Sequence, residues 1–136
     1  MFTKDVKITW LKRVPLFSEC SRRELGEIAS IADEVRLPAG RTLIKEGAAG
    51  REFIVVLDGT VEVRRGGRRA PLRGDTTFFG EMALLTGKPR SATVKTTSPV
   101  QALVITDYAF RRLLKANPGI QRKLLASLAA RVADAD

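Results

Sequence analysis

Histidine is missing from the 136 residues of this chain, and cysteine occurs once, as Cys20. Without histidine there can be no Ser-His-Asp or Cys-His catalytic arrangement and no histidine-rich metal site. A single cysteine cannot form an intramolecular disulfide, which favours a reducing compartment and a cytoplasmic location. No nucleophile-base pair or metal-ligand cluster stands out elsewhere, so we expect no enzymatic activity and no bound metal. Cys20 itself we interpret as an inert, packed side chain.

Long apolar runs are also missing. None approaches the roughly 18 to 20 apolar residues needed to cross a bilayer, and the N-terminus, MFTKDVKITWLKR, lacks the continuous apolar core of a signal peptide. We therefore expect a protein that is neither exported nor inserted in a membrane. The length suits one domain, residues 1–136, with a proper core.

Acidic residues are the minority among the charged ones: 24 Lys and Arg face 15 Asp and Glu, for a net charge of +9. A basic balance is one mark of nucleic-acid binding. The basic residues are scattered, however, except for a cluster from Arg64 to Arg69. The two glycines at the centre of this cluster favour a solvated hairpin tip. Aromatic residues, the platforms on which single strands stack, make up only 6%. Nucleic-acid binding by this arginine cluster and by the basic residues of the last helix is an alternative.

The first part of the chain, residues 1–36, carries helical patterns. Ser21 and Glu24 have the spacing of a capping box, in which each side chain bonds the other residue's free amide. Apolar residues then recur at three- and four-residue spacing, at Leu25, Ile28, Ala29 and Ala32. The Pro38-Ala39-Gly40 segment is expected to end this region.

Residues 37–107 have the pattern of short strands. A β-rich run, Phe53 to Leu57, precedes the tight-turn pair Asp58-Gly59, and Gly66-Gly67 is a second turn signal. Many short strands separated by turn glycines indicate a small sandwich or barrel. The expected fold is therefore mainly β, with helices at both ends.

Residues 107–133 return to helix. Asn117 and Pro118 are expected to start the last helix, since proline at the first position forgoes an amide that would be unpaired anyway. This helix carries an apolar stripe that we interpret as core or as a dimer seam: Ile120, Leu124, Leu125, Leu128 and Val132.

The stretch from Phe79 to Val94, FGEMALLTGKPRSATV, combines groups suited to a small anion. Gly80 permits close approach of the backbone to a ligand. The turn formed by residues 81–85 would point free amides at an anion. Glu81, at the start of this turn, is better suited to accept a hydrogen bond from a neutral hydroxyl, as acidic residues do with a ribose.

Arg90 and Ser91 complete this set of groups. The arginine supplies a permanent charge and a fork of donors that matches phosphate, and the serine adds a hydroxyl beside it. A sugar hydroxyl and a phosphate held close together imply a compact nucleotide. The competing interpretation is that Glu81 and Arg90 form an ordinary ion pair across a hairpin.

The same stretch resembles the phosphate-binding cassette of the cyclic nucleotide-binding domain family, whose pattern is Phe-Gly-Glu, an aliphatic residue, Ala-Leu, a short variable loop and Pro-Arg-Ser/Ala-Ala-Thr. The resemblance extends over about Leu11 to Val132 and implies an eight-stranded jelly-roll β-barrel with flanking helices. It also implies roles: Glu81 for the ribose 2′-hydroxyl, and Arg90 with Ser91 for the cyclic phosphate. The ligand-binding residues it implies are Phe79, Gly80, Glu81, Met82, Ala83, Arg90, Ser91, Ala92 and Val63.

Within that family, the bacterial catabolite activator proteins are most similar in the C-terminal helices. Their purine-contacting Thr-Ser pair falls here at about Ala135-Asp136, and no helix-turn-helix segment follows, so DNA binding by this chain is not expected. The resemblance implies a regulatory sensor of cyclic nucleotide, cAMP favoured over cGMP, with no permanent cofactor. Ligand would re-dock the helix after Asn117, and a protein partner or a homodimer would read the change. A scaffold that keeps the fold without binding nucleotide is a further alternative.

Overall fold

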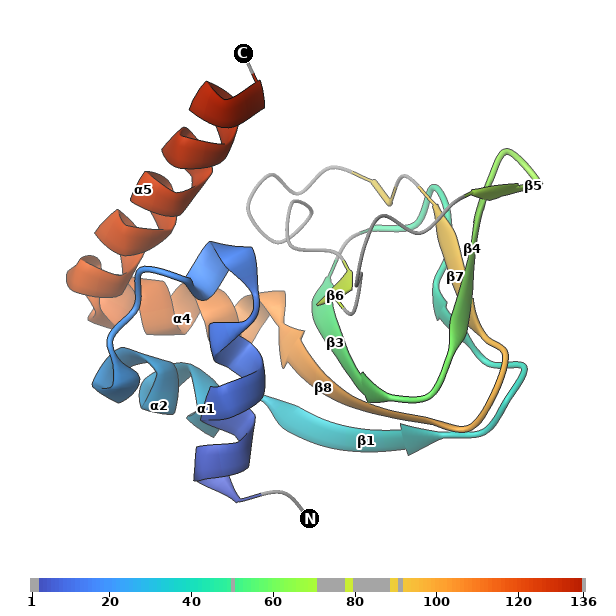
Figure 1. Cartoon of the computed structure of the whole chain (residues 1–136), viewed down its shortest axis with the longest axis horizontal. Helices are drawn as coiled ribbons and strands as arrows, with labels where there is room; N and C mark the ends of the chain where they lie inside the picture. The colour runs from blue at the N-terminus through green and yellow to red at the C-terminus, as the bar shows by residue number, and fades with distance from the viewer. Residues whose placement is uncertain (1–2, 50, 71–77, 80–88, 91, 136) are drawn as a thin grey trace. The chain divides into compact units, whose positions relative to one another are not determined.

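The computed structural model describes residues 3–49, 51–70, 78–79, 89–90 and 92–135 (Figure 1). The backbone packs into two compact units. One, the helical unit, comprises Met1–Ala32 and Tyr108–Asp136, and the other, the β unit, comprises Asp33–Asp107. The expected organisation as one domain stays a prediction. No helix in the described ranges has both the length and the apolar character needed to cross a membrane.

The first two α-helices of the helical unit begin at side-chain caps. Thr3 accepts a hydrogen bond from the Val6 amide, and the Ser21 hydroxyl accepts one from the Glu24 amide at 3.2 Å. Glu24 returns the contact, its Oε1 accepting from the Ser21 amide at 2.8 Å, so the predicted capping box is confirmed. The elements are α1 (Lys4–Lys12), the 3₁₀ turn η1 (Pro15–Phe17), α2 (Arg22–Ser30), α4 (Asp107–Ala116) and α5 (Pro118–Ala135).

Aromatic and aliphatic side chains from all of these helices form the core of the unit. The Phe17 and Phe110 rings lie 6.4 Å apart between centroids, tilted by 53°. Cys20 is buried beside this core, and its burial, chiefly, raises the pKa of the thiol to about 11. The thiol is therefore protonated at neutral pH, as the interpretation of an inert side chain requires.

The buried face of α5 differs in part from the predicted stripe. Ile120 and Leu124 are buried as expected, but Leu125 is 60% exposed and Ser127 is buried. The reason is the helical period, because residues 120, 124 and 127 lie on one face while residue 125 is turned about 100° from residue 124. One member of the predicted stripe thus faces solvent and a hydroxyl takes a place in the core.

The β unit consists of two antiparallel four-stranded sheets, with strand orders β1-β8-β3-β6 and β2-β7-β4-β5. The described residues thus form eight strands, the number expected of the jelly roll. The helical region predicted to reach residue 36 ends earlier, because β1 already begins at Asp33 and pairs with β8 through Val104. The strands are β1 (Asp33–Leu37), β2 (Thr42–Ile44), β3 (Glu52–Asp58), β4 (Val61–Arg65), β5 (Arg68–Ala70), β6 (Phe78–Phe79), β7 (Thr93–Thr96) and β8 (Val100–Thr106).

The two sheets enclose an apolar cluster to which both contribute, including Ile54 and Val56 of β3 and Val63 of β4. Both predicted glycine turns are present. Gly59, at φ +101°, lies in the turn that carries the chain from β3 in one sheet to β4 in the other. Gly66 and Gly67, both at positive φ, close the β4–β5 hairpin in the manner of a type I′ turn.

Candidate functional site

The two ends of the cassette segment both attach to strand β3. At one end, the backbone of Phe79 in β6 pairs with Ile54 of β3, and β6 lies beside β3 in Figure 1. At the other end, Nη2 of Arg90 donates a hydrogen bond to the main-chain carbonyl of Glu52, the first residue of β3. Residues 79 and 90 are therefore anchored two positions apart on the same strand.

The main chain of Arg90 is held by the loop that follows β2. The Gly47 amide donates to the Arg90 carbonyl and the Arg90 amide donates to the Ala48 carbonyl, each at 2.9 Å. Nearby, the Glu46 amide donates to the Thr93 hydroxyl at 3.0 Å. These bonds fix the backbone from which the Arg90 side chain extends.

The Arg90 guanidinium is buried, with 9% of the residue exposed, and its Nη1 atom has no hydrogen-bond partner among the described residues. Burial lowers the pKa of Arg90, and the negative charge of Glu52 acts in the opposite direction. An arginine nevertheless keeps its charge in a protein. Among the described residues, the site thus contains a desolvated cation with one donor that has no acceptor, an arrangement that attracts an anion.

Two further site residues lie in the apolar interior of the β unit. Val63 and Ala92 are 7% and 8% exposed, and both belong to the apolar cluster between the sheets. Val63 pairs in register with Val94, two residues beyond Ala92. Their nucleotide-lining roles stay predictions.

The remaining predicted site residues lie outside the described residues: Gly80, Glu81, Met82, Ala83 and Ser91. The alternative prediction, an ion pair between Glu81 and Arg90, lies outside them as well. Sequence reasoning missed the Glu52 carbonyl and the loop of residues 45–49. Both act through main-chain atoms, which carry no side-chain signal, so no motif could have pointed to them. No cluster of three or more potential metal ligands occurs in the part of the chain that the structure describes.

Comparisons with known proteins agree with this geometry. A family model described as the cyclic nucleotide-binding domain matches residues 34–117, more than half of the chain. The cAMP-dependent protein kinase regulatory subunit of Aspergillus fumigatus is 37% identical over 118 residues, which is 84% of this chain and 28% of that protein.

Two solved structures share the fold. The N-terminal domain of a transcriptional regulator from Streptomyces coelicolor A3(2) superposes with a TM-score of 0.83 at 30% identity, over 93% of this chain and 94% of that one. The catabolite activator protein of Thermus thermophilus gives a TM-score of 0.70 at 29% identity, over 90% of this chain and 60% of that one. The predicted likeness to catabolite activators is thereby confirmed.

These findings define the class: the chain belongs to the cyclic nucleotide-binding domain family. The predicted fold class is confirmed with it. The chain spans 28% of the length of the fungal regulatory subunit that it matches.

Proposed function

We propose that this chain is a regulatory module that binds a cyclic nucleotide, cAMP by preference, through the phosphate-binding cassette. The observation that supports it is the buried Arg90 guanidinium, whose Nη1 has no partner among the described residues. A cyclic phosphate would supply both the missing acceptor and the missing negative charge. Such a charge-assisted contact contributes about 1.5 to 3 kcal/mol.

The rest of the proposed site follows from the cassette sequence. Glu81 accepts a hydrogen bond from the ribose 2′-hydroxyl, and Ser91 donates to a phosphate oxygen. Phe79, Gly80, Met82 and Ala83 surround the ligand from the cassette turn, with Val63 and Ala92 behind it. The preference for cAMP is supported by the relative named as a cAMP-dependent protein kinase regulatory subunit.

The consequence of binding, in this proposal, is a new position for α5 and no chemical reaction. The ligand exchanges reversibly, so no permanent cofactor is needed. A protein partner, or a second copy of this chain packed along α5, reads the change, and DNA is not contacted by this chain alone. We place the module in the cytoplasm of a bacterium, a location that suits its reduced, buried Cys20.

Calorimetric titration with cAMP and with cGMP tests the ligand, after bound nucleotide has been stripped by unfolding and refolding. We expect Arg90→Ala to weaken cAMP binding about 100-fold or more, because a buried charged contact is lost. Arg90→Lys restores part of the affinity, since it keeps the charge and loses the fork. Arg36→Ala, which removes an exposed arginine of β1, is the matched control. Equal cAMP affinity in Arg90→Ala and Arg36→Ala would refute the site.

The response of the helical unit has its own probe, because Trp10 in α1 is the single tryptophan of the chain. Its ring stacks with the Arg13 guanidinium, 4.8 Å from the ring centroid, so its emission depends on local packing. We expect saturable changes in Trp10 emission and in hydrogen exchange along α5 upon addition of cAMP. Binding measured by calorimetry without either change would disprove the switch while leaving the binding site intact.

A further inference from the structure

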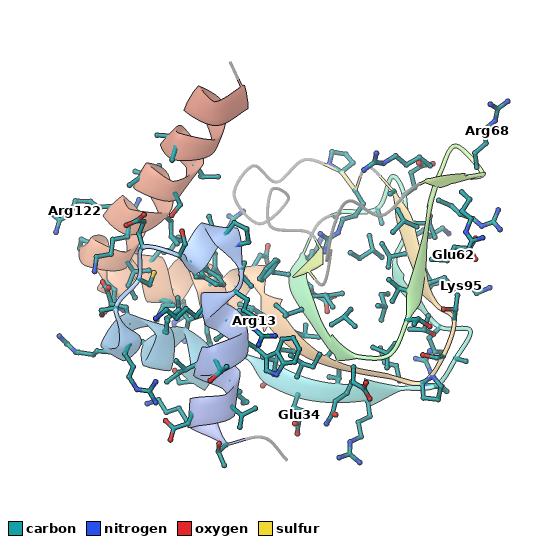
Figure 2. All side chains as sticks on the ribbon, in the orientation of Figure 1. Arg13, Glu34, Glu62, Arg68, Lys95 and Arg122 are labelled. Atoms are coloured by element: carbon teal, nitrogen blue, oxygen red, sulfur yellow. The ribbon has the colours of Figure 1, made fainter. Side chains whose placement is uncertain are left out.

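The tip of the β4–β5 hairpin concentrates positive charge on an exposed surface. Arg64 and Arg65 end β4, Arg68 and Arg69 begin β5, and all four are exposed. Arg68 extends from the tip away from the sheets in Figure 2. We refer to these four arginines as the arginine tip.

Most of this charge is not used within the described structure. Arg64 is engaged locally, with its Nε 2.5 Å from Glu62 and its Nη1 donating to the Gly67 carbonyl. The side chains of Arg65, Arg68 and Arg69 have no hydrogen bond or ion pair with a described residue. Three guanidinium groups are thus available to an anionic partner.

The position of β5 restricts which anion fits. Among the described strands β5 is the last of its sheet and pairs with β4 alone. Arg65 and Arg68 flank the two-residue turn as a hydrogen-bonded pair, so the next pair, Arg64 and Arg69, is not hydrogen-bonded. The amide and carbonyl of Arg69 therefore point to the open edge. An extended peptide matches that alternation of donor and acceptor, whereas a nucleic-acid backbone offers phosphate oxygens alone.

The turn between Arg65 and Arg68 is also linked to Arg90, through hydrogen bonds made by Glu46 and Gly47. The Gly66 amide at the hairpin turn donates to both carboxylate oxygens of Glu46, at 3.0 and 3.3 Å. The next residue, Gly47, donates its amide to the Arg90 carbonyl. A displacement of Arg90 would thus reach the hairpin turn through residues 46 and 47.

We propose that the β4–β5 hairpin is a docking surface for an extended acidic segment of a partner protein. The segment pairs with the edge of β5 at Arg69 and sets its carboxylates against Arg68 and Arg69, which alternate between the two faces of the strand. Cyclic nucleotide alters this docking through the Glu46 link; that coupling rests on the proposed function, and the docking does not.

Fluorescence anisotropy with a labelled peptide of about eight glutamates, the length of an ordinary strand, tests the docking on the full chain. We expect Arg68→Gln with Arg69→Gln to weaken binding about tenfold or more. The control, Arg111→Gln with Arg122→Gln, removes the same charge from exposed positions on α4 and α5 and should bind as the parent does. A peptide methylated at alternate amides cannot donate strand hydrogen bonds and should also bind about tenfold more weakly.

Several results would overturn the docking surface. Equal loss in the two double variants would mean that net charge alone attracts the peptide. Equal binding of the methylated peptide would exclude strand pairing. Tighter binding of an oligonucleotide duplex than of the peptide, dependent on Arg68 and Arg69, would identify a nucleic-acid surface instead. No peptide binding near physiological salt would likewise refute the proposal.

The coupling has a separate readout. We expect saturating cAMP to change the peptide affinity about fivefold, and Glu46→Gln to reduce that effect. Arg90→Ala should abolish the effect of cAMP on the peptide affinity, because it removes the group that holds the cyclic phosphate. A parent protein that binds cAMP without any change in peptide affinity would overturn the coupling. A parent that binds peptide but not cAMP would show that the proposed function had failed and the docking surface had not.

Discussion

The helical unit and the β unit treat their partly buried charges in opposite ways. In the helical unit, Glu24 accepts hydrogen bonds from the Ser21 amide and from the Lys123 ammonium, so its charge is fully used within the fold. In the β unit, Arg90 donates from Nη2 to a carbonyl and leaves Nη1 open among the described residues. A charged group whose hydrogen bonds are all made within the fold stabilises the structure. A buried charged group with an unused donor is instead able to bind a ligand.

The two units also differ in the range of their contacts. The capping box and the α2 face depend on residues three or four apart. The β unit joins residues distant in sequence, such as Glu34 with Leu103 and Val63 with Val94. A substitution in a turn that positions such strands should therefore lower the free energy of unfolding more than the loss of a single helical contact. Three substitutions test that contrast.

Gly59→Ala should have the largest effect. At φ +101°, an added Cβ would lie 2.3 Å from the Pro99 carbonyl oxygen, so the turn must shift. We expect a loss of about 3 kcal/mol in the free energy of unfolding, measured by denaturant titration, with faster hydrogen exchange in β3, β4 and β8.

Gly40→Ala is its matched control. Gly40 also has positive φ, at +84°, but an added Cβ meets nothing within 4 Å. It should lose only about 1 kcal/mol, from the left-handed backbone itself. Equal losses at the two glycines would mean that the contact with Pro99 does not matter and that the turn yields.

Glu24→Gln comes next and probes the closed contact of the helical unit. The hydrogen bonds from Lys123 and from the Ser21 amide lower the pKa of Glu24 from 4.5 to about 2. The ionised form therefore stabilises the fold fully above pH 4.5, and this contribution is lost as the pH falls toward 2. We expect Glu24→Gln to lose about 1.5 kcal/mol at pH 7 and to show a shallower decline in acid.

Thermal unfolding from pH 7 to pH 2.5 or so measures this decline. Glu27→Gln, on the same helix, is the control and should follow the parent curve. If Glu24→Gln follows the parent curve as well, the contact with Lys123 contributes nothing to stability. Glu24 would then no longer serve as the stabilising counterpart of Arg90.

Ser127→Ala should have the smallest effect, with the opposite sign. Its Oγ is buried and has no hydrogen-bond partner among the described residues. Removing it abolishes a desolvation cost and improves helix propensity, so we expect a gain of about 1 kcal/mol in chemical denaturation. Gln121→Ala, at an exposed position of α5, measures the part of the stability gain that comes from helix propensity alone. A loss of stability in Ser127→Ala would show that the hydroxyl is satisfied after all, and that Arg90 is the sole open group of this pair.

Local sequence signals predicted the helical unit well. The capping box at Ser21 and Glu24, the start of α5 at Pro118 and the buried face of α2 all depend on neighbours within one turn. The start of β1 was predicted wrongly, because residues 33–36 become a strand through pairing with β8, about seventy positions away in the sequence. The exposure of Leu125 was missed because two adjacent leucines cannot share one helical face.

Residue types and their spacing predicted the order of helix, strands and helix, the glycine turns and the choice of Arg90 as the cation of the candidate site. Only the tertiary structure shows that this guanidinium is desolvated, that both ends of its segment attach to β3, and that Glu46 holds the turn of the β4–β5 hairpin. Those features depend on backbone atoms brought together from distant positions. Since nearly every residue carries the same backbone amide and carbonyl, the sequence does not show which of them will meet.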